Sequence, residues 1–90
     1  MQFDWDSKKA AANLKKHRVS FEEAETVFGD PLARIFDDDF HSLDERRSAI
    51  FGHSNKNRLL IVSYAEQEGD KIRLISARQA TPKEGRRYAN

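Results

Sequence analysis

Two arginines, Arg73 and Arg78, lie near the carboxyl end of the sequence, where a strand-like run leads into a predicted helix start. No acidic residue separates them, and between residues 71 and 90 six basic residues stand against one acidic residue, Glu84. The net charge of the whole chain is only +1. Positive charge is therefore concentrated at this end, as expected for a surface that meets phosphate or an acidic partner.

A second group of polar residues invites a metal-site interpretation. Asp37, Asp38 and Asp39 are consecutive, and His41 follows them closely. Hard cations take carboxylates and transition metals take imidazole. We predict no metal or cofactor here, because adjacent aspartates on a turn do not converge on one ion and the twelve-residue calcium-loop pattern is absent.

The elements that position these residues begin with two helices. Asp6 is placed as the N-cap of a helix that runs to about His17, with Ala10 and Leu14 on its apolar stripe. Ser20 begins a capping box of the form S-x-x-E, so a second helix follows after a short link. The run Gly29-Asp30-Pro31 is predicted to end it.

A third, short helix is predicted at the end of the chain. Thr81 and Glu84 form another capping box, with Pro82 at the first helical position. If this helix docks on the rest of the chain, it brings Arg86 and its neighbours close to Arg78.

The remaining segments alternate like strands, at residues 2–5, 32–36, 46–54, 58–65 and 71–77. The sequence thus predicts an α+β fold, an antiparallel sheet of four to five strands with two N-terminal helices and one short C-terminal helix. Regular alternation puts Arg73 and Arg78 on opposite faces of the last strand. They can serve one site only if a bulge or the end of the strand intervenes.

Length and composition limit the class of protein. Ninety residues predict a single domain, 1–90, with one modest core. The absence of cysteine fits a reducing compartment. No apolar run is long enough for a membrane span and no signal peptide is visible, so we expect a soluble cytoplasmic protein without a membrane partner.

The sequence resembles the BrnT-like toxins of bacterial type II toxin-antitoxin modules. The stretches that carry the resemblance cover nearly the whole chain in order: Phe3–Asp6, Asn13–His17, Val19–Ala24, Val27–Phe28, Asp30–Pro31, His41–Ser42, Glu45–Arg46, Gly52, Ser54, Arg58–Leu59, Ile75–Arg78, Glu84 and Tyr88. One departure is Arg18, where the family usually has glycine. If that position is left-handed, arginine costs on the order of 1 kcal/mol.

The resemblance implies a RelE-like fold and a metal-independent endoribonuclease. It also implies neutralisation by a BrnA-type antitoxin with a ribbon-helix-helix region, and contact with operator DNA only through that antitoxin. Cleavage through the 2′-OH needs a base, an acid and cations around the phosphorus. The candidates for these catalytic roles are His41 and Glu45 for proton transfer and Arg46, Arg73 and Arg78 for charge stabilisation. The candidates for RNA binding are Lys16, His17, Tyr64, Arg86 and Tyr88.

Structural alternatives stand beside these roles. Glu45 and Arg46 form a possible surface ion pair, His17 a possible partner of its helix C-terminus, and Arg78 a possible partner of Glu84. At the level of function, the alternative is a non-catalytic partner-binding module that acts as a co-repressor with the antitoxin. A DNA-binding domain is disfavoured, because the second helix carries three glutamates and no basic recognition surface.

Overall fold

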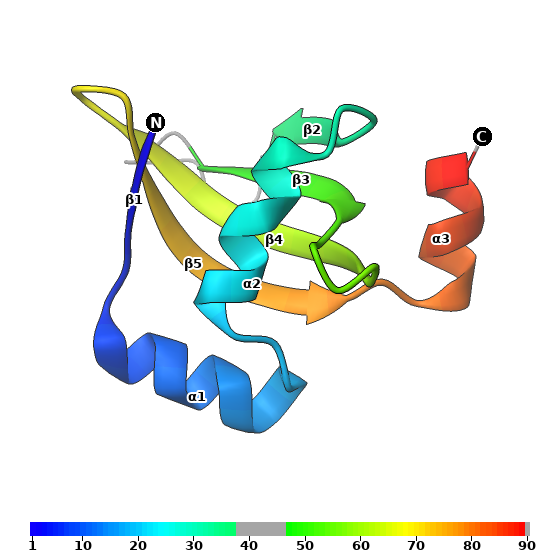
Figure 1. Ribbon diagram of the computed structural model, residues 1–90, viewed down its shortest axis with the longest axis horizontal. Coiled ribbons are helices and arrows are strands. Elements are labelled where there is room, and N and C mark those ends of the chain that lie inside the picture. Colours follow the sequence, from blue (N-terminus) through cyan, green and yellow to red (C-terminus); the bar gives the residue numbers. More distant parts are fainter. Residues whose placement is uncertain (38–46, 90) are drawn as a thin grey trace.

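The computed structural model describes residues 1–37 and 47–89, which form a curved sheet with helices around it (Figure 1). The elements in chain order are β1 (Gln2–Asp4), α1 (Ser7–His17), α2 (Phe21–Thr26), the 3₁₀ helix η1 (Val27–Gly29), β2 (Arg34–Asp37), β3 (Arg47–His53), β4 (Leu59–Gln67), β5 (Lys71–Gln79) and α3 (Pro82–Ala89). The order of strands in the sheet is β1-β5-β4-β3-β2. The predicted α+β order is confirmed.

The sheet is mixed rather than antiparallel throughout. Strands β2 to β5 pair antiparallel, whereas β1 pairs parallel with β5. The sequence pattern did not predict this, because β1 is separated from its partner by the two helices and three strands. Only three residue pairs join β1 to β5, from Gln2 opposite Lys71 to Asp4 opposite Arg73.

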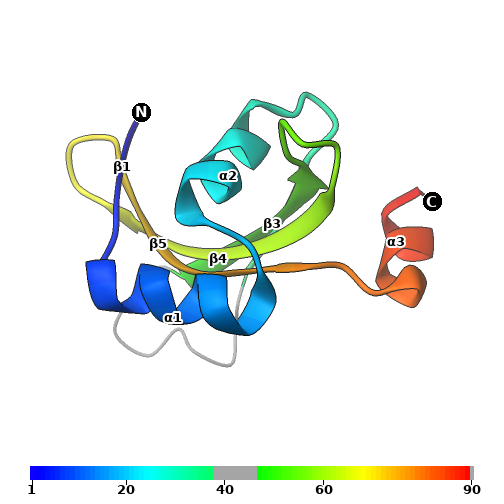
Figure 2. The same ribbon diagram turned by 60° about the horizontal axis from the view of Figure 1, so that its bottom comes forward.

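The core lies between one face of the sheet and the two N-terminal helices. Figure 2 shows the sheet curving around α2, with α1 running beside β5. Phe21 and Val27 are fully buried against sheet residues such as Leu60 and Val62. Burying a side chain of this size contributes about 1.5–3 kcal/mol, so this face carries much of the stability. We call it the inner face.

The helix starts predicted from the sequence are confirmed. The Asp6 carboxylate accepts hydrogen bonds from the backbone of Lys8 and Lys9 at 2.8 and 3.1 Å. Ser20 Oγ accepts one from the Glu23 backbone at 3.0 Å. Helix α1 ends at His17 and is capped by Arg18, whose φ of 60° and ψ of 32° are left-handed.

The apolar stripe predicted for α1 is wrong in one position. Leu14 is 49% exposed, whereas Asn13 is only 7% exposed. The Asn13 amide donates to Ala77 O at 2.8 Å and Val19 O at 2.9 Å, and its oxygen accepts from Ala77 N at 3.0 Å. Because β1 ends at the position opposite Arg73, the Asn13 side chain takes the place of a strand partner at Ala77.

A bulge interrupts β5 between the two arginines. Ser63 pairs with Ser76 and Tyr64 pairs with Leu74, so Ile75 is an extra residue on β5. The buried residues Leu74 and Ala77 therefore share the inner face despite their odd spacing. The same shift places Arg73 and Arg78 together on the opposite, outer face. Among the described helices, none is long and apolar enough to cross a membrane.

Candidate functional site

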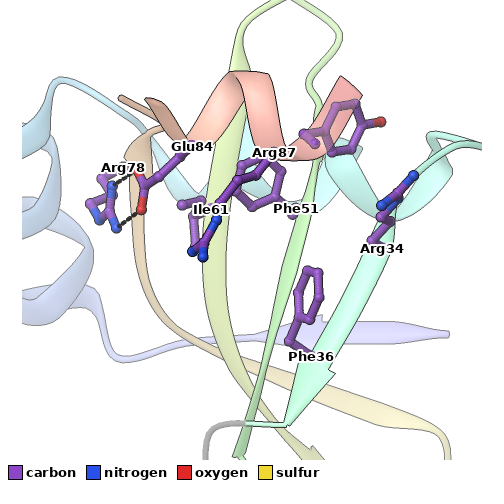
Figure 3. Close-up of a pocket in the computed structure, with 8 residues that line it drawn as sticks. Arg34, Phe36, Phe51, Ile61, Arg78, Glu84 and Arg87 are labelled. Atoms are coloured by element: carbon purple, nitrogen blue, oxygen red, sulfur yellow. Dashed lines mark hydrogen bonds and ion pairs between the residues drawn. The ribbon is translucent and has the colours of Figure 1, made fainter. Parts of the chain in front are cut away.

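A cleft of about 540 Å³ lies on the outer face, between the sheet and α3 (Figure 3). Its floor is a row of residues that face one another across four strands. Arg34 of β2 pairs with Phe51 of β3, Phe51 with Ile61 of β4, and Ile61 with Arg78 of β5. Two apolar side chains are thus flanked by a guanidinium group at each end.

Helix α3 forms one wall of the cleft. Glu84, Arg87 and Tyr88 line it, and their spacing of three and four residues puts them on one helical face. Phe36, two residues beyond Arg34 on β2, lines the cleft from the other side. Figure 3 shows Arg87 extending from α3 toward Ile61. The lining side chains thus comprise three arginines, one carboxylate and three aromatic rings.

The Arg78 guanidinium forms a two-pronged ion pair with the Glu84 carboxylate. Its two terminal nitrogens donate to Oε1 at 2.8 Å and to Oε2 at 2.9 Å. Glu84 Oε1 also accepts from Thr81 N at 2.9 Å, while Thr81 Oγ1 accepts from Glu84 N at 3.2 Å. These bonds complete the predicted capping box and hold the pKa of Glu84 down at about 2, chiefly through Arg78. The predicted structural alternative for Arg78 is thus confirmed.

Tyr88 fastens the other end of α3. Its ring stacks on Phe51 with centroids 5.1 Å apart and planes 15° apart. Its hydroxyl lies 3.1 Å from both Asp30 Oδ2 and Leu32 O, to which it donates. Burial and the neighbouring Asp30 carboxylate raise the pKa of Tyr88. The hydroxyl is therefore a neutral anchor, and only the ring is turned to the cleft.

Asp30 organises the loop that receives Tyr88. Its carboxylate accepts from the backbone of His53 at 2.7 Å and of Leu32 at 2.9 Å. These bonds, the one to His53 first, lower the pKa of Asp30. The loop approaches β3 closely because Gly52 has no side chain; a Cβ there would lie 3.0 Å from Asp30 Oδ2.

Arg73 and Arg78, which the sequence allows to serve one site, do not come together in the structure. Arg78 lines the cleft, but Arg73 lies five residues away along β5 and does not line it. Arg73 is 3.6 Å from Asp4 Oδ1 across the β1–β5 pairing. The bulge satisfies the parity condition, yet Arg73 lies beside Asp4 whereas Arg78 pairs with Glu84 on α3.

The predicted RNA-binding residues lie in different parts of the structure. Tyr88 lines the cleft, whereas Arg86 is exposed on α3 outside the lining. Lys16 and His17 lie at the end of α1 and do not line the cleft either. Tyr64 must be withdrawn as a stacking residue, because it is 1% exposed on the inner face and packs edge-on against Phe28. His41, Glu45 and Arg46 lie outside the described residues.

Sequence reasoning missed Arg34, Phe36, Phe51 and Arg87 as a group. The sequence of β4 carries one indication of the cleft. Its consecutive apolar residues point to both faces of the sheet, which predicts that the second face is covered as well. Ile61 is that second-face residue and lies in the cleft.

Within residues 1–37 and 47–89, no three His, Asp or Glu side chains lie together as metal ligands would.

Comparison with known proteins gives a family for this chain. The family model of the ribonuclease toxin BrnT of type II toxin-antitoxin systems matches residues 5–84. The chain belongs to this family. Its fold also resembles the crystal structure of the Brucella abortus ribonuclease toxin BrnT, with a TM-score of 0.71 and 24% identity over 90% of this chain and 97% of that one. A comparison with curated protein sequences gives no match.

Membership in the BrnT family fixes the class of activity and of partner. The chain is a BrnT ribonuclease toxin of a type II toxin-antitoxin system, so RNA is its substrate and an antitoxin its partner. The outer-face cleft of this BrnT chain combines cationic and aromatic side chains.

Proposed function

We propose that this BrnT toxin is an endoribonuclease whose substrate lies in the outer-face cleft. The observation that carries the proposal is the composition of the lining, where three guanidinium groups surround apolar and aromatic side chains. Arginine recognises phosphate by paired hydrogen bonds, and aromatic rings stack on bases. With one carboxylate against three cations, the cleft retains an excess of positive charge.

The proposed reaction is metal-independent attack of a ribose 2′-oxygen on the adjacent phosphorus. A base removes the 2′-OH proton, the bond from phosphorus to the 5′-oxygen breaks, and an acid protonates that oxygen. Glu84 is a poor base, because its pKa is held at about 2. We keep His41 and Glu45 as the proposed proton-transfer groups and Arg46 as a proposed cation. In sequence they fall between β2 and β3, whose residues Phe36 and Phe51 line the cleft.

The partner proposed for inhibition is a BrnA-type antitoxin with a ribbon-helix-helix region. Operator DNA would then be contacted through the antitoxin, and the toxin would act on RNA in the cytoplasm. These assignments rest on the sequence resemblance and on membership in the BrnT family. An excess of positive charge in the cleft suits an inhibitor that presents acidic side chains.

The direct test is RNA cleavage by the purified toxin without its antitoxin, in the presence of a metal chelator. We expect the wild type to shorten a labelled RNA, and the Arg87→Gln variant, purified identically, to be much slower. Lys83→Gln is the matched control, because Lys83 is exposed on the same helix and does not line the cleft. Intact RNA at a large excess of folded wild type would contradict the proposal and favour the non-catalytic co-repressor.

A further inference from the structure

Phe36 is an aromatic ring that the fold leaves uncovered. It is 53% exposed on β2, and its register opposite Ala49 puts it on the outer face beside the cleft. The ring of Phe51 is already occupied, because Tyr88 stacks on it. An exposed ring in a cleft that also carries guanidinium groups provides a surface on which a nucleic-acid base can stack.

The guanidinium groups that line the cleft together with Phe36 differ in their availability. Arg78 is engaged by Glu84 through both terminal nitrogens. In the part of the chain that the structure describes, no ion pair joins Arg34 or Arg87 to a carboxylate. Arg34 and Arg87 are therefore the guanidinium groups ready to bind phosphate, one on the β2 side and one on the α3 side of the cleft (Figure 3).

The exposure of the bases decides whether single-stranded or duplex RNA fits the cleft. In a duplex the bases are stacked on one another, and the A-form major groove is too narrow for side chains to read. A single strand can turn a base outward onto an aromatic ring while its backbone follows cations. A cleft of about 540 Å³ is the size of a small-molecule site rather than of a groove for a duplex.

We propose that the cleft selects single-stranded RNA by holding one unpaired nucleotide, with its base on Phe36 and the adjoining phosphates on Arg34 and Arg87. This inference rests on the proposed function, because it takes the outer-face cleft as the RNA site. It assigns Arg78 a different task, namely to fasten α3 so that Arg87 faces the cleft. The substrate class is then any RNA with an unpaired segment, and the duplex is disfavoured.

Binding can be separated from cleavage with a probe that lacks the attacking hydroxyl. A labelled 2′-O-methyl RNA oligonucleotide is titrated with the toxin, alone and annealed to its complement, and fluorescence anisotropy gives both affinities. We expect the single strand to bind at least about ten-fold more tightly than the duplex, because a paired base cannot reach the ring. Equal affinities for the two forms would overturn the inference.

Variants of β2 test the ring itself. Phe36→Leu is expected to weaken single-strand binding at least about five-fold, the lower end for loss of base–aromatic stacking, and Phe36→Trp to preserve it. Ile35→Ala is the matched control, because Ile35 is 60% exposed on the same strand but faces the opposite side of the sheet. If Phe36→Leu behaves like Ile35→Ala, the ring is not the platform. Circular dichroism confirms that each variant is folded.

Salt dependence tests the two arginines. Each phosphate contact to a single strand contributes about 0.7 to the slope of log affinity against log salt concentration. Arg34→Gln and Arg87→Gln should each lower the slope by about that amount, and Lys83→Gln should leave it unchanged. Unchanged slopes in both arginine variants would overturn the assignment.

Three further outcomes separate this inference from others. In the first, the wild type cleaves RNA, Phe36→Leu binds the single strand as tightly as the wild type does, and the duplex binds as tightly as the single strand. In that case the proposed function stands and this inference fails. If no oligonucleotide binds and no RNA is cleaved, both fail. If a poly-glutamate peptide binds as tightly as the single strand and loses affinity in Phe36→Leu, the cleft belongs to an acidic protein segment, and the inference is again overturned.

Discussion

Replacing Arg18 by glycine should make the protein more stable. Arg18 caps the end of helix α1 with φ of 60° and ψ of 32°, and its backbone N–H donates to Leu14 O at 2.9 Å. A residue with a side chain costs about 1–2 kcal/mol in this region, because its Cβ crowds the following carbonyl. Glycine avoids that cost but gives the unfolded chain about 0.5–1 kcal/mol more conformational freedom. We expect a net gain of about 0.5–1 kcal/mol.

The contacts of Arg18 support this magnitude. Its carbonyl accepts from the Arg58 guanidinium at 3.0 Å, and glycine keeps that bond because it involves only the backbone. The Arg18 side chain is exposed, so little packing is lost. For a chain of this size, the gain corresponds to a melting temperature about 2–8 °C higher in thermal unfolding followed by circular dichroism.

Arg18→Ala is the control for this prediction. Alanine removes the same charge and the same long side chain but keeps the Cβ, so its melting temperature should not rise as that of Arg18→Gly does. A melting temperature for Arg18→Gly at or below that of the wild type would refute the reasoning. The reasoning would also be refuted if Arg18→Ala and Arg18→Gly raised the melting temperature equally, because the removed charge would then be the cause.

Three further predictions concern stability. Arg58→Met leaves the Glu23 carboxylate, 3% exposed, without its ion-pair partner, and should lower the free energy of unfolding in urea by about 3 kcal/mol. The pKa of Glu84 is about 2 in the folded state against an ordinary 4.5, so the unfolded chain binds the proton more readily between these values. Stability should therefore fall as pH decreases from about 4.5 toward 2, and Glu84→Gln should remove its part of that decline, no more than about 1 kcal/mol for a partly exposed pair. Gly52→Ala should destabilise by about 1–3 kcal/mol in urea, because the new Cβ would lie 3.0 Å from Asp30 Oδ2; an unchanged urea midpoint would show that the loop yields freely.

Local features of the fold were predictable because their causes are local. Asp6, Ser20 and Thr81 cap helices through hydrogen bonds to residues two or three positions away, and such contacts are visible in the sequence. The need for a bulge between Arg73 and Arg78 also followed from counting residues along one strand. The structure places the extra residue at Ile75.

The cleft was not predictable in the same way, because its members come together only through strand order. Arg34, Phe51 and Arg78 belong to one row across the sheet, although 44 positions separate the first from the last. Nothing local indicates that α3 folds back over this row. The burial of Asn13 was unpredictable for the same reason. It depends on the pairing of β1, the strand before α1, which ends opposite Arg73 and leaves Ala77 without a strand partner on that side.

For Arg78, the sequence and the structure suggest different roles. Proximity to a basic segment suggested a phosphate ligand, whereas the structure shows a guanidinium already held by Glu84 on α3. The two roles make opposite predictions for Glu84→Gln. If Arg78 binds phosphate, freeing it should tighten RNA binding. If Arg78 instead fastens α3 and thereby positions Arg87, then Glu84→Gln and Arg78→Gln should weaken binding to a similar extent. We expect the second result in the anisotropy titration, because α3 carries Arg87 and Tyr88 into the cleft and the Arg78–Glu84 pair ties its first turn to β5. Tighter binding by Glu84→Gln would restore Arg78 as the phosphate ligand.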